Sequence, residues 1–135
     1  MTPTLLGRWQ SRFFLLATVG LFVTIPFVLL FRSVAPIIIL ILVLVFGLGW
    51  DVLYSRLQKR RWDHDWPPTL QLAAGVVEGI FVFGLLYGLI RSNALPAPPI
   101  FWLHYATVWP TTFLPSQSFM RLYFPRWRYR GGQWW

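Results

Sequence analysis

Four long apolar stretches, separated by short polar segments, dominate the chain. The stretches cover residues 13–31, 36–54, 70–90 and 100–120. About 20 helical residues, at a rise of about 1.5 Å each, span the hydrocarbon core of a bilayer. Each stretch is long enough, so the pattern predicts an all-α membrane protein: a compact bundle of four transmembrane helices in a single domain.

The polar segments indicate how these helices are joined. Arg32 and Ser33 form almost the whole connection between the first two stretches, which predicts a tight antiparallel hairpin. Residues 55–69 form a longer loop between the second and third helices. The fourth stretch contains Pro110 and Pro115, and proline inside a helix removes a hydrogen bond. We therefore predict a fourth helix that is kinked at proline, with a re-entrant segment as the alternative.

Basic residues lie at alternate ends of the apolar stretches. Of the 12 Lys and Arg residues, all except Arg32 and Arg91 precede the first stretch, lie between the second and third, or follow the fourth. Positive residues are retained on the cytoplasmic side of a membrane. We therefore predict that both termini, the 55–69 loop and the basic, aromatic tail 121–135 are cytoplasmic. The predicted location is a bacterial cytoplasmic membrane or an internal membrane derived from it.

Composition supports a membrane protein and argues against several functional classes. The chain is 56% apolar and 12% charged, with a mean hydropathy of +0.55, which leaves no room for a separate soluble domain. The net charge of +8 comes from residues that flank the stretches, so we do not expect nucleic-acid binding. The lack of cysteine excludes disulfides and thiolate metal sites. No catalytic motif or metal-binding pattern is present, so we do not expect an enzyme.

Glu78 is the sharpest candidate for a functional residue. It is the only acidic residue well inside a predicted span, where an ionised carboxylate is costly unless it is paired. At about 100° per residue, Gln71 and Gly75 share its face of the third helix. Gly84 and Gly88 form a small-residue pair on another face, suited to helix packing.

A second polar stripe, formed by His104, Thr107 and Thr111, follows the fourth stretch. Because the third and fourth helices are antiparallel neighbours, we expect the two stripes to face each other. Glu78 is then expected to pair with Thr111 or with the Trp109 indole. Either this pairing fixes helix register, or Glu78 binds a proton or cation on a transport path.

His104 also raises the question of a cofactor. A neutral imidazole in an aromatic-rich helix is suited to axial ligation of a haem or chlorophyll-type tetrapyrrole. The other histidine, His64, lies in the 55–69 loop and offers no second ligand inside the bundle. The sequence therefore requires no cofactor, and a tetrapyrrole stays an open alternative.

Charged and aromatic residues gather on the predicted cytoplasmic face. We expect the loop aspartates to pair with neighbouring arginines, Asp65 or Thr69 to cap the third helix, and Asp51 to pair with Arg8 or Arg12. The loop and tail are expected to contact a partner protein or anionic lipid headgroups. The candidate contact residues are Arg60, Arg61, Trp62, Asp63, His64, Asp65, Trp66, Arg126, Trp127, Arg128, Arg130, Trp134 and Trp135.

Together, these sequence features predict that the chain is a non-catalytic accessory, scaffold or assembly subunit of a larger membrane complex. The alternative is a small transporter or channel, acting as a homo-oligomer, that uses Glu78 as its proton or cation site. A further alternative is a lipid-interacting protein that shapes the membrane.

Overall fold

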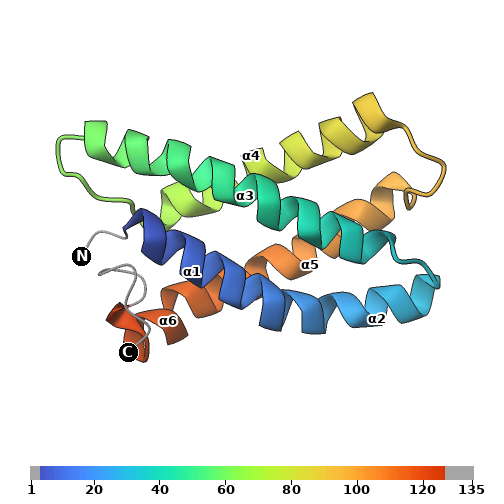
Figure 1. Cartoon of the computed structure of the whole chain (residues 1–135), viewed down its shortest axis with the longest axis horizontal. Helices are drawn as coiled ribbons and strands as arrows, with labels where there is room; N and C mark the ends of the chain where they lie inside the picture. The colour runs from blue at the N-terminus through green and yellow to red at the C-terminus, as the bar shows by residue number, and fades with distance from the viewer. Residues whose placement is uncertain (1–3, 127–135) are drawn as a thin grey trace.

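Long helices joined by short connections make up the computed structural model, which describes residues 4–126 (Figure 1). The helical segments are α1 (Leu5–Leu15), the π-helical η1 (Leu16–Gly20), α2 (Leu21–Phe31), α3 (Ala35–Arg60), α4 (Pro68–Phe83), the π-helical η2 (Gly84–Ile90), α5 (Pro98–Gln117) and α6 (Phe119–Leu122). α1, η1 and α2 follow one another without a break, as do α4 and η2. The described residues contain no strand, so the all-α prediction is confirmed.

Three helices in the described part of the chain are long and apolar enough to cross a membrane. They run over Leu5–Phe31, Ala35–Arg60 and Pro68–Ile90, which supports a multi-pass membrane protein. α5 is not among them, because histidine, threonine and two internal prolines lower its hydropathy. A full crossing by α5, its kink at proline and the cytoplasmic position of the termini therefore stay predictions.

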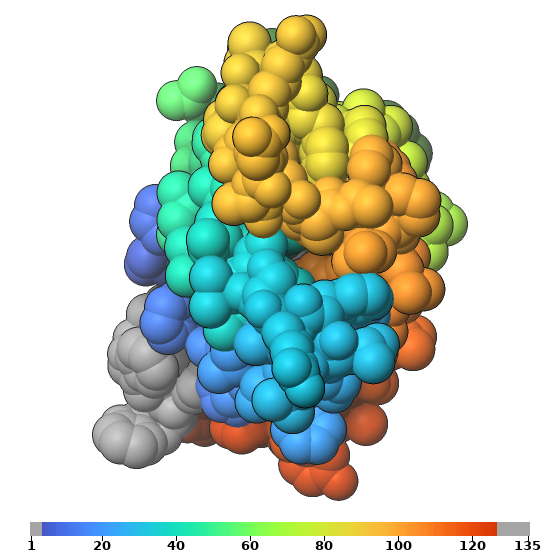
Figure 2. All heavy atoms as spheres, turned by 90° about the vertical axis from the view of Figure 1, so that its right-hand side faces the viewer, coloured from blue at the N-terminus to red at the C-terminus, as the bar shows by residue number. Residues whose placement is uncertain are grey.

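The helices contact one another around a closed bundle. α1 and α2 contact both α3 and α5, α3 contacts α4, and α4 contacts α5. The start of α1, the loop between α3 and α4, and α6 lie at one end of the bundle, which we call the inner end (Figure 1). The turn between α2 and α3 and the linker between η2 and α5 lie at the opposite, outer end (Figures 1 and 2).

Two helices extend further towards the inner end than their apolar stretches indicated. The first begins at Leu5 rather than at residue 13, because the Thr4 hydroxyl accepts a hydrogen bond from the Gly7 amide at 3.1 Å and caps the helix. α3 continues beyond residue 54 to Arg60, as expected for an amphipathic extension that leaves the membrane. The 55–69 loop is correspondingly reduced to residues 61–67.

Proline marks the start of the three later helices. α3, α4 and α5 each carry proline in their first two positions, where a missing amide donor costs nothing. α4 therefore begins at Pro68 with Pro67 as its N-cap and without a side-chain cap, so the predicted cap from Asp65 or Thr69 was wrong. α5 runs over Pro98–Gln117 rather than 100–120.

The outer connections are tight. Arg32 and Arg91 end α2 and η2 in the left-handed conformation, with φ of 46° and 48°. The predicted hairpin between the first two helices is thus confirmed. The Tyr87 hydroxyl donates to the Pro96 carbonyl at 2.7 Å, which fastens the outer linker to η2.

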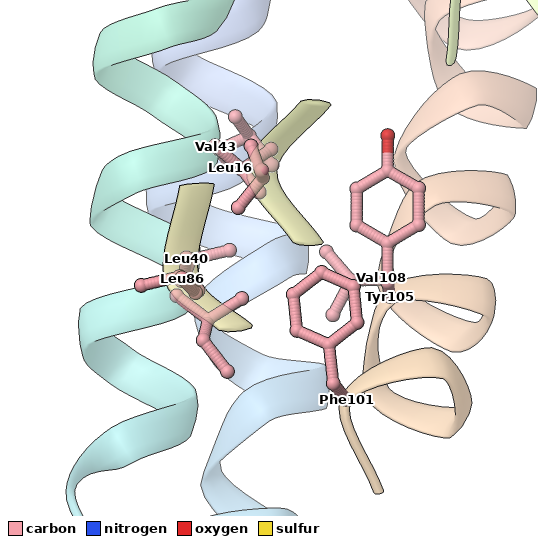
Figure 3. Close-up of a cluster of buried hydrophobic side chains, with 9 residues drawn as sticks. Leu16, Leu40, Val43, Leu86, Phe101, Tyr105 and Val108 are labelled. Carbon is pink, nitrogen blue, oxygen red and sulfur yellow. The ribbon is translucent and has the colours of Figure 1, made fainter. Parts of the chain in front are cut away.

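The larger of two buried apolar clusters extends from the middle of the bundle towards its outer end, and a smaller one joins Leu15 to Met120. Side chains from η1, α3, α4, η2 and α5 meet in the larger cluster, with Phe101 and Tyr105 opposite the aliphatic residues (Figure 3). We call this set the apolar cluster; it comprises Leu16, Ile39, Leu40, Val43, Val82, Leu86, Phe101, Tyr105 and Val108.

Candidate functional site

A buried arginine holds two carboxylates from two other helices. Arg12 of α1 donates Nε and Nη2 to the two oxygens of Asp51 on α3, at 2.9 and 3.0 Å. It donates Nη1 and Nη2 to the two oxygens of Glu78 on α4, at 2.8 and 3.1 Å. Four charge-assisted hydrogen bonds therefore join three helices through one guanidinium group, and we call these residues the charge cluster.

The charge cluster lies deep inside the protein. Only 12% of the Arg12 side chain is exposed, and 3% of each carboxylate side chain. Glu78 lies near the middle of the candidate span Pro68–Ile90. Burial strengthens these interactions, since little water screens them, but each buried charge has also lost its hydration.

A glycine makes room for the guanidinium. A Cβ atom added to Gly47 of α3 would lie 2.2 Å from Arg12 Nη1 and 2.7 Å from Cζ. Gly47 lies one helical turn before Asp51, so α3 presents a gap and then a carboxylate to Arg12. The expected pairing of Asp51 with Arg12 is confirmed, and Asp51 is buried within the bundle.

The partner of Glu78 differs from the predicted one. Its carboxylate binds Arg12, not Thr111 or the Trp109 indole. Thr107 and Thr111 instead donate their hydroxyls to carbonyls of their own helix, as threonine inside a helix commonly does. The predicted polar stripe on α5 therefore does not face the Glu78 carboxylate.

α4 and α5 are nevertheless close neighbours, because two glycines admit aromatic rings. A Cβ atom on Gly75 would lie 1.9 Å from Trp109 Cε2, and one on Gly79 would lie 2.5 Å from Tyr105 Cε1. The Tyr105 hydroxyl also donates to the Gly75 carbonyl at 2.6 Å. Gly75 thus packs against α5, consistent with its predicted role in helix packing.

Gly84 and Gly88 do not pack against the rest of the described chain. A Cβ atom at either position would meet nothing within 4 Å. Both residues lie in η2, where the wider π-helical turn changes the phase of the helix. Their predicted role in packing against another helix therefore stays a prediction.

A pocket of about 80 Å³ adjoins the charge cluster. Arg12 and Asp51 line it, whereas Glu78 does not. The remaining lining residues are Arg8, Ser11, Leu15, Leu16, Val43, Gln71, Tyr105, Val108, Trp109, Thr112, Phe113 and Ser116.

Trp66 packs beside two residues that line this pocket, Arg8 and Gln71. Its ring stacks on Tyr54 with centroids 5.2 Å apart, and the Arg8 guanidinium lies 5.2 Å from the ring centroid. Its indole donates to Gln71 Oε1 at 3.0 Å, and Arg8 donates to Gln58 Oε1 at 2.7 Å. Trp66 was predicted to contact lipid or a partner, but it packs within the chain; Trp62 is the loop tryptophan that is exposed.

The exposed loop carries an ion pair of ordinary character. Arg61 binds Asp63 through two hydrogen bonds at 3.0 and 2.8 Å, as expected. The hydrogen bond from Arg61 lowers the pKa of Asp63 to about 2. The ion pair therefore stabilises the folded loop fully above the ordinary carboxyl pKa, and this stabilisation is lost as pH falls towards 2. Asp65 accepts from the Trp66 amide at 2.9 Å, and the His64 carbonyl accepts from Gln58. Arg60 is exposed at the end of α3.

His104 lies in a separate buried position in the outer half. The Thr24 hydroxyl donates to the Gly20 carbonyl at 2.7 Å, so at 2.9 Å it accepts from His104 Nε2–H. Phe27 packs edge-on against the ring at 5.0 Å. Nε2 is engaged, whereas the buried Nδ1 has no hydrogen-bond partner among the described residues. The tetrapyrrole stays an alternative.

Within residues 4–126, no group of three or more His, Cys, Asp or Glu side chains is arranged to hold a metal ion. Arg126 is exposed. The predicted contact residues Trp127, Arg128, Arg130, Trp134 and Trp135 lie outside the described residues.

Sequence reasoning identified Glu78 but missed its cation. Arg12 precedes the first apolar stretch and was interpreted as a flanking residue, although it lies inside the helix that begins at Leu5. Ser11, next to it, was not identified either. Comparison with known proteins gives no match to any protein-family model, curated protein or solved structure.

Proposed function

We propose that this chain is a small proton- or cation-binding transporter or channel subunit, with the charge cluster as its functional centre. One observation carries the proposal: a single guanidinium holds two carboxylates inside the membrane-spanning part of the protein. With all three groups ionised, the cluster has a net charge of −1. One proton or one monovalent cation makes it neutral.

The geometry favours an exchangeable proton. Arg12 Nη2 binds one oxygen from each carboxylate, so the two acidic groups lie close together. Like charges at short range oppose simultaneous ionisation, most strongly where water is scarce. Intramembrane ionisable groups that face a cavity commonly belong to ion or proton pathways. The pocket lined by Arg12 and Asp51 gives this cluster such a cavity.

The position of the apolar cluster supports access to the charge cluster from the inner end of the bundle only. On η1, α3, α4 and η2, its members all lie towards the outer end relative to Arg12, Asp51 and Glu78. They separate the charge cluster from the outer end, whereas the pocket lies towards the inner end. Transport would then need either a rearrangement of this layer or a pathway completed by a second copy of the chain.

The Glu78→Gln variant tests the proposal. Glutamine keeps the shape of the side chain but leaves Arg12 and Asp51 as a neutral pair without an exchangeable proton. We expect proton flux into vesicles reconstituted with the protein, driven by a potential and followed with a pH-sensitive dye, to fall to the level of protein-free vesicles. Asp63→Asn is the matched control, because it removes an acidic group from an exposed arginine pair, and it should leave the flux unchanged.

Flux that persists in Glu78→Gln, with helicity like that of the parent protein, would exclude the charge cluster as the proton site. A parent protein that carries neither protons nor monovalent cations would favour the second proposal, a non-catalytic accessory or scaffold subunit of a larger membrane complex. The open positions at Gly84 and Gly88 favour that second role, since small residues on a free helix face allow another helix to approach closely.

A further inference from the structure

We infer that the pocket beside Arg12 is a water-filled entrance from the inner end, and that Asp51 is the carboxylate that exchanges a proton with its water. The role of Asp51 rests on the proposed function, whereas the entrance does not. Sequence reasoning gave Asp51 only a pairing role near the membrane surface.

The size of the pocket suits water, and part of its otherwise apolar wall offers polar groups. A cavity needs about 10–15 Å³ to hold one water molecule, so a volume of about 80 Å³ has room for several. Ser11, Gln71, Thr112 and Ser116 supply hydroxyl and amide groups along the walls. Water in a cavity of this kind has the polar partners that it needs.

Ser11 provides an independent indication. Only 3% of the residue is exposed, and its Oγ has no hydrogen-bond partner among the described residues. Buried hydroxyl groups are almost always hydrogen-bonded. Because Ser11 lines the pocket, water there supplies the missing partner.

The position of the pocket sets its direction. Arg8, Gln71 and Ser116 come from the inner ends of α1, α4 and α5. Leu16, Val43 and Val108, which also line the pocket, belong to the apolar cluster. The pocket therefore extends from the inner end and stops at the apolar layer.

The same geometry distinguishes the two acidic residues. Asp51 lines the pocket, but Glu78 lies behind the Arg12 guanidinium and does not. A hydronium ion in the pocket can transfer its proton to a carboxylate oxygen of Asp51 and leave as water. The charge cluster then becomes neutral without any movement of Glu78.

Single-cysteine labelling tests the entrance directly, because the chain contains no cysteine of its own. In reconstituted vesicles, Ser11→Cys and Thr112→Cys should react with a small charged methanethiosulfonate. Both should react from the side that labels Trp62→Cys, the inner marker, and not from the side that labels Ser92→Cys, the outer marker. Thr24→Cys, buried outside the pocket with 0% exposure, should stay unlabelled.

Labelling of both pocket positions only by a lipid-soluble reagent would show that the pocket opens to acyl chains, and would overturn the entrance. Reaction from the outer side, or none with either reagent, would overturn it as well. Using two positions guards against a single variant that fails to fold. The labelling result does not depend on proton flux. The inference of an entrance and the proposal of transport can therefore be rejected independently of each other.

A water-soluble carbodiimide tests the assignment of Asp51. A protonated carboxylic acid adds across a C=N bond of the reagent, and mass spectrometry of peptides locates the adduct. At mildly acidic pH we expect an adduct on Asp51 and none on Glu78, with the exposed Asp65 as the reactive reference. An adduct on Glu78 without one on Asp51, or an unmodified Asp51 beside a modified Asp65, would overturn the assignment.

Discussion

Replacing Arg12 by methionine is expected to destabilise the bundle by about 3–5 kcal/mol, the cost typical of removing one partner from a buried ion pair. The substitution keeps much of the side-chain volume but leaves Asp51 and Glu78 buried without their cation. The free energy of unfolding is measured by titrating sodium dodecyl sulfate into mixed micelles and following helicity by circular dichroism.

Two comparisons make this result specific. Arg56→Met removes an exposed arginine from α3 and should change the free energy of unfolding by no more than about 0.5 kcal/mol. Adding Asp51→Asn and Glu78→Gln to Arg12→Met should recover most of the lost stability, because no uncompensated charge then remains buried. Equal losses in Arg12→Met and Arg56→Met would show that the charge cluster does not hold the helices together.

Gly75→Ala is expected to destabilise the contact between α4 and α5 by about 3 kcal/mol, at the upper end for overpacking a core. The added Cβ would lie 1.9 Å from Trp109 Cε2 and 2.0 Å from Cζ2, inside a rigid indole ring. Alanine is intrinsically the better helix former by about 1 kcal/mol, so any loss of stability comes from this contact. The same detergent titration measures the effect.

Gly84 and Gly88 provide matched controls for Gly75→Ala. Both lie in the same continuous helix, but a Cβ atom at either position meets nothing within 4 Å. Gly84→Ala and Gly88→Ala should therefore leave stability unchanged or raise it slightly. If all three alanine variants behaved alike, the predicted packing of Trp109 on Gly75 would be wrong.

The sequence predicted the helices well because hydropathy reports lipid exposure over long windows. The all-helical fold, the tight turn at Arg32 and the burial of Glu78 all follow from local composition. The predicted positions of helix ends were less accurate at the inner end. There Thr4 caps a helix whose start hydropathy would place at residue 13. Polar residues in a terminal turn lower the hydropathy without ending the helix.

The charge cluster could not be predicted fully, because its members are far apart in sequence. Arg12 and Glu78 are separated by 66 residues, and no local pattern relates them. A usable signal was present nevertheless. Gly47 precedes Asp51 by one helical turn, which places a small residue beside a buried acid.

The π-helical turns were not predicted. η1 and η2 begin at Leu16 and Gly84, and nothing in the hydrophobic pattern marks these positions. Gly75 and Glu78 were placed on a shared buried face correctly. Gly88, which lies within η2, is open towards the outside of the described chain, so its role in helix packing stays a prediction.

Infrared difference spectroscopy gives the most direct test of the claim that Asp51 and Glu78 share one proton. The parent protein should show the carbonyl stretching band of one protonated carboxylic acid. Neither Asp51→Asn nor Glu78→Gln should show this band, because a single carboxylate then balances Arg12. A parent protein without the band would contradict the claim and would show both carboxylates ionised, with their charge balanced by Arg8, one turn away, or by a bound cation.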